Sequence, residues 1–134
     1  MTEKKDCKYT IELSEEQMRL IAYCMEDICR FACGQWQLQY TVQEMIKDLP
    51  FEEYMKRRVD AEEHLRQAKH ALLPDFADNQ SYGYNSTEFI GNVYQIYRSI
   101  MHQLAIDHNW DNVYSSPALP SGTMGTIKIN KIKE

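Results

Sequence analysis

The clearest pattern in the chain is a run of apolar residues at spacings of three and four that starts after Ser14. Ser14 and Gln17 have the spacing of a capping box, and Gly34 suits the position just after a helix end. The sequence therefore predicts an amphipathic helix between Ser14 and Gly34. Its apolar stripe consists of Met18, Ile21, Ala22, Met25, Cys29 and Ala32.

Two further stretches repeat the helical period. One runs from about Phe51 to Leu73 and stops because Pro74 does not continue a helix interior. The other begins near Thr87 or Glu88. Residues 36–42 fit a strand or a helix equally well. The apolar side of the earlier stretch contains Met55, Val59, Leu65, Ala68 and Leu72, and that of the later stretch contains Ile90, Val93, Tyr97, Ile100 and Leu104.

Both ends of the chain alternate between apolar and polar residues. Residues 7–13 and 125–134 show this period of two, which is typical of strands. The expected fold is therefore α+β, with about three main helices packed on a small antiparallel sheet made from the N- and C-terminal strands. The length of 134 residues fits a single domain, 1–134.

Composition and charge narrow the class of protein. The net charge of −5 argues against a protein that coats duplex DNA, whereas a few arginines in one pocket suffice to bind a small phosphate ligand. No apolar run approaches the roughly 20 residues needed to span a bilayer, and Met1 starts no signal-peptide pattern. We expect a cytoplasmic protein that does not bind a membrane.

The cysteines do not form a typical metal or redox motif. They are Cys7, Cys24, Cys29 and Cys33, with no CxxC pair, so we expect reduced thiols and no metal. Cys29 lies in the apolar stripe, where a free cysteine acts as a small buried apolar residue. No GxSxG, P-loop or GxGxxG motif occurs, so we expect neither catalysis nor a cofactor.

Arg30 and the loop at 77–87 are the two candidate ligand contacts. Arg30 either pairs with Glu26 four residues earlier, or joins the backbone amides of Gly34 and Gln35 in gripping an anion. In the loop, Gly83 permits a close backbone approach and the neighbouring tyrosines suit base stacking. The plain alternative is an ordinary loop with one tyrosine in the core. The cationic run 56–58 is either a solvated face or a source of charge for a nucleotide ligand.

The order of several short motifs resembles a known family. These are a strand, a capped helix ending in an arginine and a Gly-Gln-aromatic step, then "LLPDF", "NQSYGY" and "VYQIYRSIMHQLAID". The chain is identified by this order as a member of the first-described Thoeris anti-defence family, the phage sponges. The resemblance covers residues 8–107 discontinuously. It implies an α+β protein that binds glycocyclic ADP-ribose without cleaving it and, in some members, CBASS cyclic trinucleotides at a separate site.

The resemblance also implies site residues and partners. The expected ADP-ribose-type site comprises Arg57, Tyr82, Gly83, Asn85, Arg98 and His102, and the trinucleotide-type site or oligomer contact comprises Arg30, Gly34 and Gln35. Met101 stands where an arginine is common in the family, so either another cation such as Arg98 takes its place or the preferred ligand differs. The implied assembly is a homodimer, or a hexamer of three dimers, in the host cell cytoplasm. The alternatives are a protein-interaction module without a nucleotide ligand and a metal-dependent enzyme using the cysteines.

Overall fold

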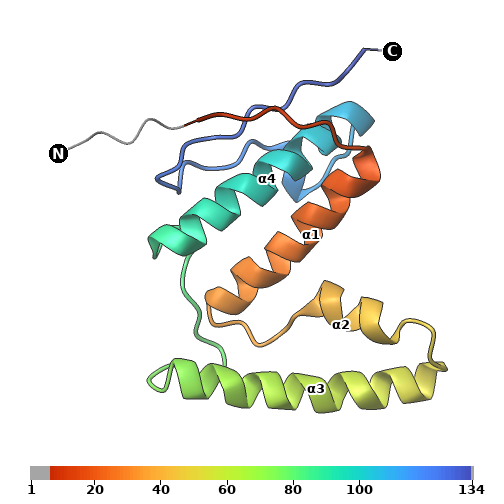
Figure 1. Cartoon of the computed structure of the whole chain (residues 1–134). Helices are drawn as coiled ribbons and strands as arrows, with labels where there is room; N and C mark the ends of the chain where they lie inside the picture. The colour runs from red at the N-terminus through yellow and green to blue at the C-terminus, as the bar shows by residue number, and fades with distance from the viewer. Residues whose placement is uncertain (1–6, 134) are drawn as a thin grey trace.

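The computed structural model describes residues 7–133, and these contain four α-helices and one short 3-10 turn (Figure 1). The segments predicted to be helical correspond to the first, third and fourth helices. None of the described helices combines the length and apolarity needed to cross a bilayer. The elements are α1 (Glu15–Ala32), α2 (Gln39–Ile46), α3 (Phe51–Leu72), α4 (Glu88–His108) and the 3-10 turn η1 (Val113–Ser115).

The core lies between α1 and α4, which run side by side in opposite directions (Figure 1). Their apolar stripes face each other and exclude water, as the spacing predicted. Cys29 is 4% exposed within this core, which confirms its interpretation as a small buried apolar residue. Ile21, expected in the stripe, is 36% exposed because α4 covers the line through Ala22 and Cys29 instead. The core cluster is Ala22, Cys29, Cys33, Ile90, Tyr97, Ile100, Met101 and Leu104.

The ends of α1 are fixed by local signals in the sequence. The Ser14 hydroxyl accepts a hydrogen bond from the Gln17 N–H at 3.1 Å, and the Gln17 side chain accepts one from the Ser14 N–H at 2.8 Å. This reciprocal pair confirms the predicted capping box. Gly34 has a φ of +98°, a backbone conformation that favours glycine. The chain therefore leaves the helix at the position where the sequence predicted its end.

The segment 36–42, for which strand and helix both fitted, leads into α2. Leu38 precedes α2 and has no side-chain oxygen to cap it. Instead Asp27 of α1, which is 4% exposed, accepts hydrogen bonds from the N–H groups of Tyr40 at 3.2 Å and Thr41 at 2.7 Å. A carboxylate at a helix N-terminus satisfies free N–H groups and the helix dipole together. A tertiary contact therefore decides that this segment is helical.

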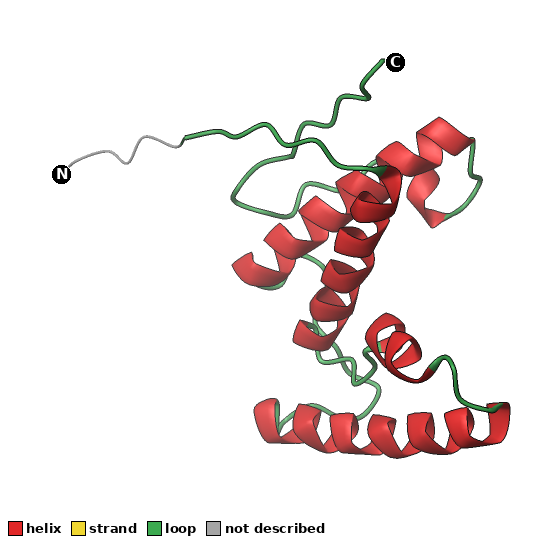
Figure 2. Cartoon of the chain, turned by 45° about the vertical axis from the view of Figure 1, so that its right-hand side comes forward, coloured by secondary structure: helices red, strands yellow, loops and turns green. Residues whose placement is uncertain are grey.

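The predicted α+β fold is wrong, because residues 7–133 contain helices and no strand (Figure 2). Residues 7–14 run as coil, with Tyr9 87% and Ile11 71% exposed. Residues 125–133 are also coil, and Glu134 lies outside the described residues. An isolated pair of short strands is marginal in water, and these two have no turn to join them and no third strand beside them.

Helix α3 packs chiefly on α2 and lies apart from the α1–α4 pair in both views (Figures 1 and 2). Lys69 is its one buried residue within the described chain. Val59 and Leu72, predicted on its apolar side, are 59% and 66% exposed. The position of α3 is therefore fixed by its contact with α2 and by the burial of Lys69 near its C-terminal end. Ion pairs between residues four apart support the helix itself, which has no buried apolar stripe in the described chain.

The segment after η1 is fastened to the start of α4. The Asn92 side-chain oxygen accepts hydrogen bonds from the N–H groups of Thr123 at 2.7 Å and Met124 at 3.1 Å. The Ser121 hydroxyl donates to the Gly91 carbonyl at 3.0 Å. A Cβ added at Gly91 would lie 2.0 Å from the Ser121 carbonyl oxygen, so this approach requires glycine.

We expect Gly91→Ala to destabilise the protein by about 1–3 kcal/mol, because the added methyl group forces the 121–123 backbone away from α4. Urea denaturation followed by circular dichroism measures the free energy of unfolding. Gly83→Ala is the matched control, since its added Cβ meets no atom closer than 3.5 Å. Equal stability of the two variants would contradict the close packing at Gly91.

Candidate functional site

The most unusual charge in the structure is that of Arg98 on α4. Its side chain is buried, with 7% of the residue exposed, and the described carboxylates lie beyond ion-pair distance from it. One terminal nitrogen, Nη2, donates to the Val113 carbonyl at 3.0 Å. The other, Nη1, is buried without a hydrogen-bond partner in the described chain. Burying a cation in this state costs free energy, and a bound anion or hydrogen-bond acceptor would reduce that cost.

Aromatic rings surround this guanidinium group. Its central carbon lies 5.0 Å from the centre of the Tyr114 ring and 5.9 Å from that of Tyr94. The Tyr94 ring in turn packs 4.9 Å from Tyr84 and meets Tyr97 edge-on at 5.8 Å. We call Arg98 and these four tyrosines the tyrosine–arginine cluster. It combines a cation with flat apolar surfaces, the pair of features that nucleotides require.

Glu26 connects this cluster to Arg30. The Tyr114 hydroxyl lies 3.1 Å from Oε2 of Glu26, and Nη2 of Arg30 lies 2.9 Å from Oε1. Burial, and then the Glu26 carboxylate, raises the pKa of Tyr114 to about 12. Burial, followed by Cys29 and Glu26, raises the pKa of Tyr97 well above its usual range. Both phenols therefore stay protonated at neutral pH.

The position of Arg30 settles its local partner. The plainer of its two interpretations, an ion pair with Glu26, is present, and half of the side chain remains exposed. The Gln35 N–H donates to the Arg30 carbonyl and the Gly34 N–H to the Phe31 carbonyl, each at 3.0 Å. These bonds form the usual closure of a helix at glycine. The amides of Gly34 and Gln35 are therefore not free to join Arg30 in gripping an anion, because the helix end uses both of them.

A buried lysine on α3 holds the start of the loop at 77–87 by hydrogen bonds. Nζ of Lys69, on a residue only 2% exposed, donates to the carbonyls of Ala77, Asp78 and Gln80 at 2.7–2.9 Å. His70 and Arg66 reach the Asp78 carboxylate from the same end of α3. This arrangement, the Lys69 clamp, fixes the start of the loop that carries Tyr82 and Tyr84.

The predicted loop residues lie at different depths. The Tyr82 N–H donates to the Cys33 carbonyl at 2.6 Å, and its ring packs 4.8 Å from that of Phe76. Gly83 makes no close backbone approach, and Asn85 is exposed. Tyr82 stays 37% exposed, so it is not the core tyrosine of the plain interpretation, whereas Tyr84 joins the tyrosine–arginine cluster.

Of the remaining predicted site residues, His102 lies beside the tyrosine–arginine cluster and Arg57 does not. His102 lies one turn beyond Arg98, and its Nδ1 is 2.8 Å from the Tyr114 carbonyl, so both side chains hold η1. Arg57 lies on α3 and pairs with Glu53 at 2.8 Å, apart from the cluster. The structure therefore brings Arg30, Arg98 and His102 around η1, and Arg57 is not among them.

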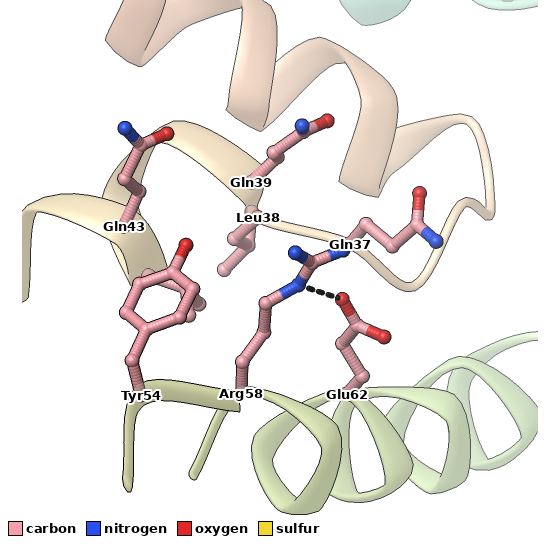
Figure 3. Close-up of a pocket in the computed structure, with 8 residues that line it drawn as sticks. Gln37, Leu38, Gln39, Gln43, Tyr54, Arg58 and Glu62 are labelled. Carbon is pink, nitrogen blue, oxygen red and sulfur yellow. Dashed lines mark hydrogen bonds and ion pairs between the residues drawn. The ribbon is translucent and has the colours of Figure 1, made fainter. Parts of the chain in front are cut away.

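The run 56–58 contributes one cation to a hollow between α2 and α3. This hollow has a volume of about 140 Å³, and Arg58 points into it together with Tyr54 (Figure 3). Glu62 already binds the Arg58 guanidinium at 3.0 Å, which reduces its attraction for a phosphate. The lining also includes Gln37, Leu38, Gln39, Val42 and Gln43.

A larger hollow of about 350 Å³ adjoins the tyrosine–arginine cluster through Tyr114. Tyr23 and Trp110 add two more rings, and Arg19 lies over Trp110 at 5.4 Å. This hollow is shallow and wide open to solvent. Sequence reasoning placed neither Tyr114 nor Trp110 in a site, because both lie in a turn-rich connection whose path only packing decides. The remaining lining residues are Met101, Asp111 and Asn112.

We expect Lys69→Met to release the loop, because three loop carbonyls then lose their shared donor. Amide hydrogen exchange over residues 77–83 should accelerate, and the free energy of unfolding should fall by about 1–3 kcal/mol. Lys56→Met, at an exposed position on the same helix, is the control and should change neither. Unaltered exchange in Lys69→Met would show that the clamp does not hold the loop.

Comparisons with known proteins identify no relative of this chain. The chain matches no family model, no curated protein and no solved structure. The tyrosine–arginine cluster, with Arg30 and the adjoining hollow, is the candidate site because it joins a buried cation lacking an anion to exposed aromatic surface.

Proposed function

We propose that this chain is a non-catalytic anti-defence protein that binds and sequesters anionic cyclic nucleotide signals. The observation that carries the proposal is the buried Arg98 guanidinium, which has aromatic neighbours and, among residues 7–133, no carboxylate partner and an unsatisfied Nη1. The ordered motifs that resemble the phage sponges support the same function, with glycocyclic ADP-ribose or a cyclic trinucleotide as the ligand.

A phosphate ligand could accept a hydrogen bond from Nη1 of Arg98 and neutralise its charge. A charge-assisted hydrogen bond to a phosphate contributes roughly 1.5–3 kcal/mol, and stacking on an aromatic ring roughly 1–3 kcal/mol per base. Arg30, half exposed beside the cluster, supplies a second cation once it turns from Glu26. Sequestration needs nanomolar affinity, about −12 kcal/mol, which several such contacts reach if the site is formed in advance.

The chemistry of the cluster favours retention of the ligand over its conversion. Tyr97 and Tyr114 have raised pKa values, so at neutral pH their phenols stay protonated and do not act as bases. Nδ1 of His102 is engaged with the Tyr114 carbonyl. These groups suit holding a ligand in place.

The test is to incubate the protein with cyclic ADP-ribose isomers and cyclic trinucleotides, remove free ligand, heat-denature the protein and identify what is released. We expect intact ligand. An altered ligand would show an enzyme, and retention of nothing across the panel would favour a protein-interaction module and overturn the proposal.

Substitutions locate the site. Arg98→Lys keeps the charge but loses the planar guanidinium, and Arg30→Ala removes the edge cation; each should weaken binding about 10–100-fold, the equivalent of one charge-assisted contact. Arg57→Ala, on the separate helix α3, should bind like the wild type. Melting temperatures of all three variants show whether weaker binding reflects unfolding. Loss of binding in Arg57→Ala alone would place the site elsewhere.

A further inference from the structure

The C-terminal end of α1 holds two buried cysteines whose thiols interact with each other. Cys29 is 4% and Cys33 7% exposed. They are four residues apart, so their side chains lie on the same face of the helix. A side-chain hydrogen bond from Cys33, followed by burial, raises the pKa of the Cys29 thiol. The same hydrogen bond lowers the pKa of the Cys33 thiol, so the two thiols differ in character.

The surroundings of the pair assign a role to each thiol. The positive charge of Arg30 favours a thiolate at Cys33, in addition to the hydrogen bond from Cys29 and against the cost of burial. The Cys29 thiol lies 3.8 Å from the Ile90 carbonyl oxygen and is placed to donate. Because the thiolate is the reactive form of cysteine, Cys33 is the attacking sulfur and Cys29 the second one.

The backbone at Cys33 permits the two sulfurs to join. Residues four apart on a helix have Cβ atoms roughly 5–6 Å apart, whereas a disulfide needs about 3.5–4.5 Å. Ala32 is the last residue of α1, so Cys33 moves toward Cys29 without interrupting a helix that continues beyond it. Gly34 follows with a φ of +98° and adapts to this movement more readily than other residues.

We propose that Cys29 and Cys33 are a modification site at which hydrogen peroxide forms an intramolecular disulfide. The Cys33 thiolate attacks one peroxide oxygen, the O–O bond breaks, and the departing hydroxide takes up a proton to become water. The Cys29 thiol then attacks the sulfur of the Cys33 sulfenic acid. The S–O bond breaks, and the oxygen leaves as a second water with the Cys29 proton. Two thiols are oxidised and one peroxide is reduced.

The disulfide would act on the loop at 77–87 through the backbone of Cys33. The Cys33 carbonyl accepts the hydrogen bond from the Tyr82 N–H at 2.6 Å. The next residue, Gly34, lies against Leu73 and Phe76. A shift of Cys33 toward Cys29 therefore pulls on the contact that holds Tyr82. This inference goes beyond the proposed function and does not depend on a nucleotide ligand.

A variant that keeps only the buried pair tests the disulfide. Cys7→Ser/Cys24→Ser removes the two exposed thiols and leaves Cys29 and Cys33. After peroxide treatment and alkylation, its intact mass should show the loss of two hydrogen atoms and no alkylated cysteine. Trypsin cuts after Arg30, so the disulfide should keep together two peptides that separate after reduction. Alkylation of both cysteines, added oxygen on either one, or a linked pair of chains would overturn the proposal.

Amide hydrogen exchange in the same variant tests the link to the loop. Tyr82 should lose protection after oxidation and regain it when dithiothreitol reduces the disulfide. The amide of Gly91, which donates to the Thr87 carbonyl within α4, is the internal control and should not change. Unchanged exchange at Tyr82 in the oxidised protein, or equal loss of protection at Gly91, contradicts a local effect on the loop.

Discussion

The packing of α1 against α4 is the contact on which the rest of the structure depends. It buries the cluster that includes Ile90, Met101 and Leu104, and it provides nearly all the apolar burial in the described chain. Polar contacts and partly buried rings attach the other elements to this pair. Asp27 caps α2, and Asn92 fastens the segment after η1. Trp110 and Tyr114 pack against the same core.

The candidate site follows from the same pair. Arg98 and His102 lie one turn apart on α4, and both reach carbonyls of η1, so the turn that carries Tyr114 is held over the helix. This contact leaves Arg98 with a buried nitrogen and without a counter-ion from the described part of the chain. Such a charge is costly in an empty site and favourable in an occupied one, because a bound anion supplies the missing partner. The cost to the free protein becomes part of the driving force for the proposed binding.

The peripheral elements of the described chain make few contacts with the α1–α4 pair. Helix α3 rests on α2 and is connected to the loop by the Lys69 clamp, and both chain ends are extended. Leu20, Cys24 and Ile28 add a line of exposed side chains along α1.

The sequence by itself determined the helices that carry a strong local signal. The capping box at Ser14, the glycine turn at Gly34 and the breaker Pro74 act within a few residues, so α1 and the end of α3 were predictable. The alternation at the chain ends was misleading, because a strand needs partners that no local pattern supplies. Only the tertiary structure decided that α2 is a helix, since Asp27 comes from another element. It also decided that Tyr114 and Arg98 meet, because their contact depends on how η1 folds back over α4.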